Sequence, residues 1–295
     1  MRLAVNATAY GDPPGGAGLR ARHLLGALKG FDLLFLLAED TPETVVPPGA
    51  EVRRLPVRAS APLRRWLTLD LPDDGDVLLT DHYPALARPP TILTLHDCGR
   101  PFRRALVRRH LARAAAVVAV SETVRRAWDV EASVVPNGVA VPDEMPPAGD
   151  HLLVVDPAKG GCPGIRSAGR EVREVGRGRA WIPQEALFRE MARAAAVLVP
   201  SRGEGFGMVA LEAMALGRPV VVPDLGAFRE VLSRHAFYVG EGGWGAAATR
   251  ALAAPAEHLA AARAHARGFT WERAAEALAR VIEVVTRRPA CTRGT

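Results

Sequence analysis

The sequence predicts an α/β protein made of two Rossmann-like, doubly wound domains in tandem. Short apolar runs rich in Val and Leu alternate with stretches of helical periodicity, which is the pattern of parallel sheets joined by helices. This alternation starts twice, on either side of a proline-rich segment. A length of 295 residues accommodates two such domains. We expect a cleft between them, because ligands of these sheets bind at the carboxyl ends of the strands.

The first domain is expected to span residues 1–141. Apolar runs predict its strands at residues 3–5, 33–37, 77–80, 91–95 and 117–120. Helical patterns predict helices at residues 19–28 and 102–115. Ser121, followed by Glu122, is typical of the start of the next helix, because a serine hydroxyl there accepts from a free backbone N–H group. The run Val134-Val135-Pro-Asn-Gly138 closes this domain.

Residues 142–150 contain three prolines and few apolar residues, which marks the boundary between the domains. The second domain is expected to span residues 150–268. Its predicted strands are residues 152–155, 197–199 and 219–222, and its predicted helices include residues 184–195 and 208–216. Helices are expected to fill the rest. The last helix, within residues 269–288, is expected to pack back toward the first domain.

The composition excludes several classes of protein. The net charge is +6, and Lys29 and Lys159 are the only lysines among 38 basic residues. Cys98, Cys162 and Cys291 lie far apart, which argues against a disulfide framework and against a structural zinc site. The first apolar run is too short for a signal peptide, and no run approaches the ~20 apolar residues of a membrane span. We therefore expect a cytoplasmic protein.

A glycine-rich loop precedes the first predicted helix. Gly16, Gly18 and Ala21 match the GxGxxA pattern of dinucleotide-binding domains, and acidic residues follow at positions 39 and 40. In that pattern the glycines follow the first strand almost at once, whereas about nine residues separate the strand from Gly15 here. Two interpretations stay open: a plain turn, or a loop whose bare backbone at Gly15 and Gly16 approaches a phosphate or sugar.

The stretch from Ser201 to Pro223 carries two carboxylates in unusual places. Glu204 lies in a glycine-rich turn, and Glu212 lies within an otherwise apolar helix. A buried carboxylate needs strong donors or a changed protonation state. The start of the helix offers N–H groups to a phosphate, while the two carboxylates suit hydroxyls, and a nucleotide-sugar carries both kinds of group. The alternatives are a buried salt bridge from Glu212 to an arginine and a solvated loop acid at Glu204.

Glu204 and Glu212 form an E-x7-E motif, and the run PSRGEGFGMVALEAMALGRPVVVPDLGAFREV resembles the signature of retaining GT-B glycosyltransferases of family GT4. Weaker likenesses occur in the right order at Gly15-Gly16, Leu95-His96-Asp97, Ala119-Val-Ser-Glu122, Val135-Pro-Asn-Gly-Val139, Lys159-Gly160 and Phe269-Thr-Trp-Glu272. The resemblance implies the GT-B fold. It also implies transfer of a sugar, with retention, from a nucleoside diphosphate to an acceptor hydroxyl.

The resemblance also implies a role for each matching residue. Glu204 would contact the donor sugar and His96 would lie beside the transferred sugar, which makes both catalytic. Glu212 would bind the ribose hydroxyls and Lys159 the diphosphate. The other donor-binding residues would be Gly15, Gly16, Gly205, Phe206, Gly207, Met208 and Val209. No metal and no cofactor are expected, because basic side chains and helix ends neutralise the leaving diphosphate.

The sequence departs from the family pattern between the strand at 152–155 and the helix at Gln184. Asp156 stands where the family has a glycine or an arginine. Only about 25 residues separate Lys159 from Gln184, and Gly160-Gly-Cys-Pro-Gly164 does not continue a helix. We therefore expect a trimmed second domain that lacks part of its sheet. Either it retains the donor site, or its nucleotide subsite is altered.

The predicted helix at residues 102–115 is strongly basic, with Arg103, Arg104, Arg108, Arg109 and Arg113. These side chains form either a solvated face or a peripheral contact with an anionic membrane, since several relatives use lipid-linked acceptors. No aromatic platform or known module accompanies the arginines, so nucleic acid is not expected as a partner.

Three functions are therefore compared. The first is a glycosyltransferase that acts on an unknown acceptor. The second is a non-catalytic nucleotide-sugar-binding protein, which a trimmed second domain permits. The third is an NAD-dependent oxidoreductase built on the loop at Gly16–Ala21, against which the long gap after the first strand argues.

Overall fold

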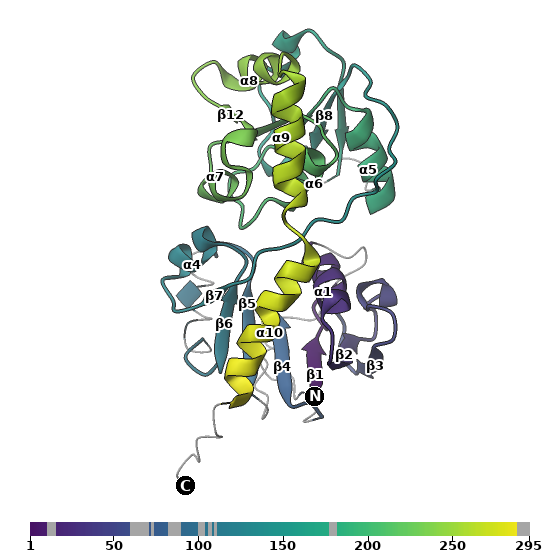
Figure 1. Cartoon of the computed structure of the whole chain (residues 1–295), viewed down its shortest axis with the longest axis vertical. Coiled ribbons are helices and arrows are strands. Elements are labelled where there is room, and N and C mark those ends of the chain that lie inside the picture. Colours follow the sequence, from purple (N-terminus) through teal and green to yellow (C-terminus); the bar gives the residue numbers. More distant parts are fainter. Residues whose placement is uncertain are drawn as a thin grey trace. The chain divides into compact units, whose positions relative to one another are not determined.

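The computed structural model of the chain describes residues 1–10, 16–59, 71, 74–81, 90–99, 104–105, 108, 111–176 and 182–287. It has an α/β fold with two sheets, and the described strand pairs of both sheets are parallel. The chain divides into two units (Figure 1). The first combines Met1–Gly138 with Trp271–Thr295, and the second is Val139–Thr270.

The first unit is built on a seven-stranded sheet with the order β3-β2-β1-β4-β5-β6-β7. Its strands are β1 Arg2–Asn6, β2 Asp32–Ala38, β3 Glu51–Leu55, β4 Val77–Asp81, β5 Thr91–Leu95, β6 Ala116–Ala119 and β7 Ser133–Val134. Strands β2 and β3 are added on one side of β1, and β4 then pairs with β1 on its other side. The strand order therefore reverses between β1 and β4, where doubly wound sheets place their ligands.

Helices of the first unit come from both ends of the chain. The helices that the structure describes in full there are α1 Gly16–Ala27, α4 Glu122–Trp128 and α10 Trp271–Arg287, with a short 3-10 helix at Glu43–Val45. One face of α10 is buried through Trp271, Ala274, Ala275, Leu278, Val281, Ile282 and Val285, a spacing that forms a single apolar stripe. Helix α10 packs against α1 (Figure 1). The ring of His23 on α1 stacks on that of Trp271, with 5.5 Å between the ring centroids.

The second unit contains a five-stranded sheet with the order β12-β11-β10-β8-β9. Its strands are β8 Leu152–Val155, β9 Val172–Val175, β10 Ala196–Leu198, β11 Val220–Pro223 and β12 Phe237–Val239. Its helices are α5 Gln184–Arg193, α6 Met208–Ala215, α7 Gly226–Leu232, α8 Gly243–Leu252 and α9 Ala256–Arg267. Three 3-10 helices cover Pro157–Lys159, Ile165–Ala168 and Ser233–His235. The strand order reverses between β8 and β10.

Apolar packing explains why the second unit holds together around this sheet. Leu152, Val154 and Leu198 project from the strands onto the small residues Ala247 and Ala248 of α8, within one buried cluster. Alanines on the helix allow it to approach the sheet closely. Helix α6 is buried along almost its whole length and packs against α5, α7 and α9.

Most predicted elements are confirmed, with instructive exceptions. The N-cap at Ser121 is confirmed, because its Oγ accepts from the Val124 N–H group at 3.1 Å. Strands β3, β7, β9 and β12 were not predicted, and all four lie at sheet edges. Strands β3 and β9 carry arginine and glutamate, because an edge strand needs less apolar surface than a central one. The expectation that helices fill the chain after residue 222 is wrong at β12.

The connection from β8 to β9 runs through 3-10 turns at Pro157–Lys159 and Ile165–Ala168. No α-helix is described between these two strands, in agreement with the glycines and proline at 160–164. Of the helix predicted at residues 102–115, residues 104–105, 108 and 111 are described and helical, residues 112–115 are described and not helical, and the others lie outside the described residues. Within the described part of the chain, no helix is both long and apolar enough to cross a lipid bilayer.

Candidate active site

The carboxyl edge of the second sheet brings together two loops that are distant in sequence. One loop follows β8 and contains Asp156 and Lys159, and the other follows β10 and contains Glu204. Strands β8 and β10 are neighbours in the sheet, with Leu153 opposite Val197. The two loops therefore emerge side by side at the reversal of strand order.

Lys159 is held between two carboxylates at this edge. Its Nζ lies 3.2 Å from Oε1 of Glu204 and 3.4 Å from Oδ2 of Asp156. The three side chains are partly buried, with 29% of the Lys159 side chain and 17% of the Glu204 side chain exposed. The ammonium group is thus fixed in place yet still reachable by a ligand.

The backbone of Asp156 adopts a conformation that favours glycine. Its φ is 56° and its ψ is 55°, in the left-handed region where aspartate is tolerated better than most residues. The carboxylate packs against Gly176, where an added Cβ would come within 2.3 Å of Oδ1. Asp156 therefore adopts a backbone conformation that favours glycine and provides a carboxylate partner for Lys159.

The turn after Glu204 leads directly into the N-terminus of α6. Gly207 caps this helix at a φ of 91°, and a Cβ there would lie 2.6 Å from Cε1 of Phe228, so only glycine fits. The first hydrogen bond of the helix runs from the Leu211 N–H group to the Gly207 carbonyl at 3.1 Å. The N–H groups of Met208 and Val209 precede it, and they form the positive end of the helix dipole.

Phe206 has a different part in this turn. Its side chain is buried and packs edge-on against Phe269, with 6.0 Å between ring centroids. The ring therefore anchors the turn within the second unit.

Glu212 is buried in α6, with only 7% of the residue exposed. Burial raises its pKa to about 8, and a hydrogen bond from Nε2 of Gln184 at 3.5 Å offsets part of this effect. No arginine or lysine among the described residues pairs with it, so the buried salt bridge considered from the sequence is absent there. Glu212 contacts Gln184 on α5, and convergence of Glu204 and Glu212 on one pocket stays a prediction.

The first unit has its own polar cluster at the carboxyl edge of its sheet. His96 follows β5 directly, and its Nε2 lies 2.9 Å from Oδ1 of Asp81, the last residue of β4. The Tyr10 hydroxyl donates to Oδ2 of the same carboxylate. Arg20 of α1 is buried, with 6% exposed, and its Nε donates to Oδ1 of Asn137 at 2.6 Å.

The charge state of Asp81 follows from these neighbours. Burial alone raises the pKa of the Asp81 carboxyl, but His96, Arg20 and Tyr10 together lower it well below its usual range. The pKa of Tyr10 is raised well above its ordinary value by burial and by the Asp81 charge. Asp81 is therefore a carboxylate and Tyr10 a neutral phenol at physiological pH.

Sequence reasoning missed most members of this cluster. Tyr10, Arg20 and Asp81 were not predicted as site residues, Asn137 was noted only within the run Val135-Pro-Asn-Gly-Val139, and Gln184 only as the start of a helix. The sequence position of Asp81 was the signal that could have found it, because Asp81 ends one apolar run and His96 directly follows another. Of the glycine loop, Gly15 lies outside the described residues. Gly16 begins α1, and the space around its Cα is open.

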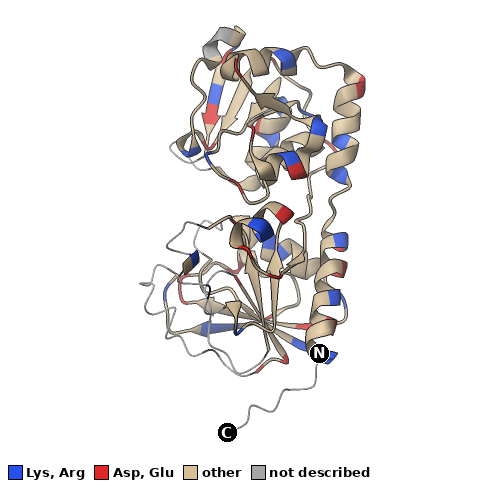
Figure 2. Cartoon of the chain, turned by 90° about the vertical axis from the view of Figure 1, so that its left-hand side faces the viewer, with Lys and Arg blue, Asp and Glu red and all other residues tan. Residues whose placement is uncertain are grey.

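The basic segment is described only in part. Arg103 and Arg109 lie outside the described residues. Arg104 donates to the Ala127 carbonyl near the end of α4, whereas Arg108 and Arg113 are exposed. Figure 2 shows basic and acidic residues distributed over both units.

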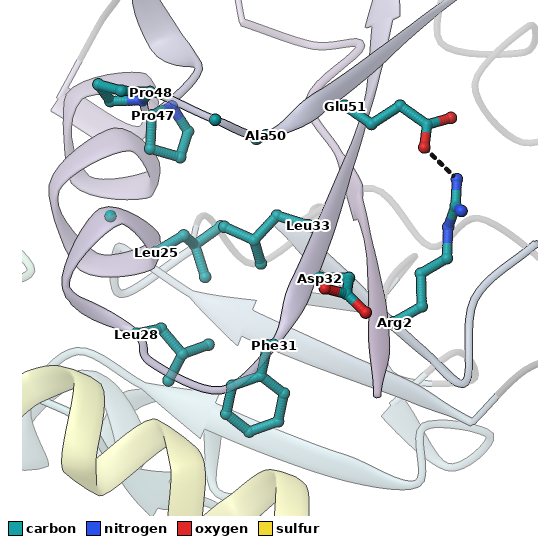
Figure 3. A pocket seen from close by; sticks show the side chains of 12 residues that line it. Arg2, Leu25, Leu28, Phe31, Asp32, Leu33, Pro47, Pro48, Ala50 and Glu51 are labelled. Atoms are coloured by element: carbon teal, nitrogen blue, oxygen red, sulfur yellow. Dashed lines mark hydrogen bonds and ion pairs between the residues drawn. The ribbon is translucent and has the colours of Figure 1, made fainter.

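A separate pocket lies at the opposite edge of the first sheet. It has a volume of about 450 Å³ and sits where β1, β2 and β3 begin, with Leu25, Phe31 and Pro47 on its walls (Figure 3). Arg2 and Glu51 pair across its rim at 2.8 Å. None of the residues predicted for a site lines it. The described residues hold no group of three His, Cys, Asp or Glu side chains that could bind a metal ion.

Two parallel α/β units in succession, each with its polar cluster at the reversal of strand order, define the architecture of GT-B glycosyltransferases. Two family profiles match successive parts of the chain. "Glycosyltransferase Family 4" matches residues 15–141, and "Glycosyl transferases group 1" matches residues 168–262. The chain belongs to this family of glycosyltransferases, with a short second domain.

Individual relatives agree with this assignment. The D-inositol 3-phosphate glycosyltransferase of Geodermatophilus obscurus is 45% identical over 98 residues, which is 31% of this chain and 22% of the relative. The matches span between 20% and 35% of the length of the first curated relatives.

Solved structures share the fold across the whole chain. Sucrose-phosphate synthase from Thermosynechococcus elongatus superposes with a TM-score of 0.75 at 18% identity and covers 97% of this chain and 99% of its own. Anabaena HepE, solved in complex with UDP-glucose, gives a TM-score of 0.71 at 17% identity, with 96% of this chain and all of HepE covered.

Proposed function

We propose that this protein is a retaining glycosyltransferase that moves a sugar from a nucleoside diphosphate to an acceptor hydroxyl. The observation that carries the proposal is the position of Lys159. Its ammonium group is held at the carboxyl edge of the second sheet, next to Glu204 and to the turn that begins α6. Membership of the family and the UDP-glucose complex of HepE, a fold neighbour, support a nucleotide-sugar as the donor.

Departure of a diphosphate builds negative charge on the leaving group, and the groups around Lys159 are suited to stabilise this charge. A compact ammonium and the N–H groups at the start of α6 stabilise such charge without a metal ion. Asp156 and Glu204 hold Lys159 in position before the donor arrives. We propose that the transfer needs no metal and no cofactor. We also propose that the backbone N–H groups of Met208 and Val209 donate to the leaving group.

The two motif glutamates have different environments and hence different roles. Glu204 is partly exposed beside Lys159, and its carboxylate accepts from hydroxyls of the transferred sugar. Glu212 is buried and its pKa is raised to about 8, so at neutral pH it is mainly protonated. A protonated carboxyl both donates and accepts, which suits a pair of ribose hydroxyls. We further propose that His96 contacts the transferred sugar and that Gly15 and Gly16 contact the phosphate.

The acceptor is proposed to be a compound with a free hydroxyl, and lipid-linked compounds are among the candidates. Arg108 and Arg113 are exposed, so they are suited to a peripheral contact with anionic lipid. This contact is proposed as an addition to the transferase activity and does not depend on which sugar is transferred.

A panel of nucleotide-sugars tests the proposal. UDP-, GDP- and ADP-sugars are added to the purified chain, and thermal protection and slow release of nucleoside diphosphate are measured. We expect protection by one base class and release that Glu204→Ala abolishes. The anomeric configuration of the product, read by proton NMR, tests retention. Protection without release identifies a binding protein instead, and protection by NAD alone refutes the proposal.

A further inference from the structure

The Asp81 carboxylate occupies a central position in the polar cluster of the first unit. One oxygen lies 2.9 Å from Nε2 of His96, and the other accepts from the Tyr10 hydroxyl. Arg20 supplies a buried positive charge from α1. These partners come from three different segments, after β1, in α1 and after β5, so the carboxylate joins parts of the chain that are distant in sequence.

The position of Asp81 is fixed by the sheet. It ends β4, and the residue before it, Thr80, accepts from Nδ2 of Asn6 on β1 at 3.1 Å. Asp81 itself pairs with Thr94 of β5 in the register of the two strands. The carboxylate therefore starts from a rigid backbone at the reversal of strand order.

The main chain next to His96 is also held in place, by hydrogen bonds at the residues that follow it. Nε1 of the fully buried Trp128 donates to the Asp97 carbonyl at 2.6 Å, and Oδ1 of Asp97 accepts from the Gly99 N–H group at 2.7 Å. The main chain of His96 therefore has little freedom. Rotation of its imidazole about the side-chain bonds is the remaining freedom, and the contact with Asp81 restricts it.

We propose that Asp81 is a positioning residue for His96, whose carboxylate holds the Nε2 side of the imidazole and directs the rest of the ring to the ligand. The proposal deepens the proposed function, on which the role of His96 at the transferred sugar rests. An ionised carboxylate is needed for this role, and the positive charge of Arg20 and the Tyr10 hydroxyl favour that ionised state. Tyr10 and Arg20 thus act on His96 through Asp81.

The first test reads the ring directly and needs no activity. In protein labelled with 15N-histidine, the buried Nε2 proton of His96 is expected to give a ring N–H signal that exchanges slowly with water, assigned by its loss in His96→Gln. Asp81→Asn replaces the charged acceptor with a neutral one of the same shape, so the signal should move upfield and exchange at least about 10-fold faster. Tyr10→Phe is the matched control, because it removes a donor to the other oxygen and should keep the signal.

The second test uses turnover. Asp81→Asn should lower kcat about 10- to 100-fold while the KM for the donor changes little, because partners that orient a histidine act on its placement in the reaction. An unchanged His96 ring signal in Asp81→Asn overturns the inference, whether or not the protein turns over. If the wild-type chain releases no diphosphate from any donor, the proposed function fails, and the NMR result still decides whether Asp81 holds the ring. Thermal melting of each variant checks that it folds. If Asp81→Asn does not fold, Asp81→Glu, which keeps the charge, replaces it.

Discussion

The Nζ atom of Lys159 lies 3.2 Å from Oε1 of Glu204, across two loops whose residues are 45 positions apart in the sequence. Partly exposed ion pairs of this kind contribute at most about 1 kcal/mol to the free energy of unfolding. Stability therefore does not explain why a chain with 38 basic residues places one of its two lysines here. The contact is better explained as a prepared site for a charged ligand.

Lys159→Ala is expected to reduce release of nucleoside diphosphate about 100-fold or more, because one fixed charge that stabilises a leaving group is typically worth that much. The free energy of unfolding should change by about 1 kcal/mol or less. The other lysine offers the matched control: Lys29 is exposed at the end of α1, so Lys29→Ala should retain full activity. Equal turnover by Lys159→Ala and the wild type would contradict the assigned role.

Glu212 makes the stability of the protein depend on pH. Its pKa in the folded chain is about 8, above the ordinary value of 4.5, so the folded state holds the proton more tightly than the unfolded state. The resulting stabilisation is complete below about pH 4.5 and is lost as the pH rises through about 8. Glu212→Gln is always neutral, so its free energy of unfolding should fall less steeply over this range, with a difference of a few kcal/mol.

Urea denaturation at several pH values between 5 and 9 measures this effect. Glu185 is exposed on the neighbouring helix α5, so Glu185→Gln should keep the pH slope of the wild type. Parallel pH curves for Glu212→Gln and the wild type would show that Glu212 does not hold a proton in the folded chain.

The central strands could be predicted from sequence because both of their faces are buried. Residues 91–95 (Thr-Ile-Leu-Thr-Leu) are apolar or β-branched throughout, and β5 has the same bounds. Strands β3 and β9 could not be predicted in this way, because Glu51, Arg54 and Glu174 are exposed at the sheet edges and interrupt the apolar pattern. Their pairing is decided by neighbours distant in the chain.

The residues of the candidate site also fall into two groups, those that a local motif predicts and those that only the strand order brings together. Lys159 and Glu204 stand in motifs, and the sequence alone singled them out. Asp81 has no motif, because its partners are Tyr10, 71 positions earlier, and His96, which the parallel pairing of β4 and β5 brings beside it. The local sequence indicates which residues begin and end a strand, whereas the order of the strands in the sheet determines which loops lie side by side.

Gly207→Ala is expected to destabilise the second unit by about 2 to 4 kcal/mol, because the new methyl group meets Phe228 and alanine disfavours a φ of 91°. Gly203 is the matched control from the same turn: it is exposed and a Cβ there meets nothing within 4 Å. Gly203→Ala should therefore stay within about 0.5 kcal/mol of the wild type. Thermal or urea unfolding decides between these values, and similar stabilities for both variants would contradict the steric argument.

Membrane contact through the basic segment predicts a dependence on lipid charge. The wild-type chain should sediment with vesicles that contain anionic lipid and not with purely zwitterionic vesicles. Reversing both exposed arginines, with Arg108→Glu and Arg113→Glu together, should weaken this binding at least about 10-fold, since each basic residue near such a surface contributes about 1 kcal/mol. Arg280→Glu with Arg287→Glu makes the same charge change on α10, where both residues are exposed. Equal losses in the two double variants would indicate a nonspecific effect of net charge.

Three histidines on the second unit predict sensitivity to acid. The ring of His235 lies 4.7 Å from that of His265 and 6.2 Å from that of His258, between centroids. Burial lowers the pKa of His235, and His265, Arg234 and His258 lower it further. The unfolded state therefore binds the proton more readily, and the stability associated with the neutral ring, present above about pH 6.5, is lost as the pH falls through the lowered pKa.

Removing the central ring should therefore make the protein less sensitive to acid. In melting curves recorded between pH 7.5 and 5, the Tm of His235→Asn is expected to fall less steeply than that of the wild type. Arg234→Gln removes one neighbouring charge and keeps the ring, so it should give a smaller change in the same direction. A Tm that falls equally steeply in His235→Asn and the wild type would show that protonation of this ring does not limit stability in acid.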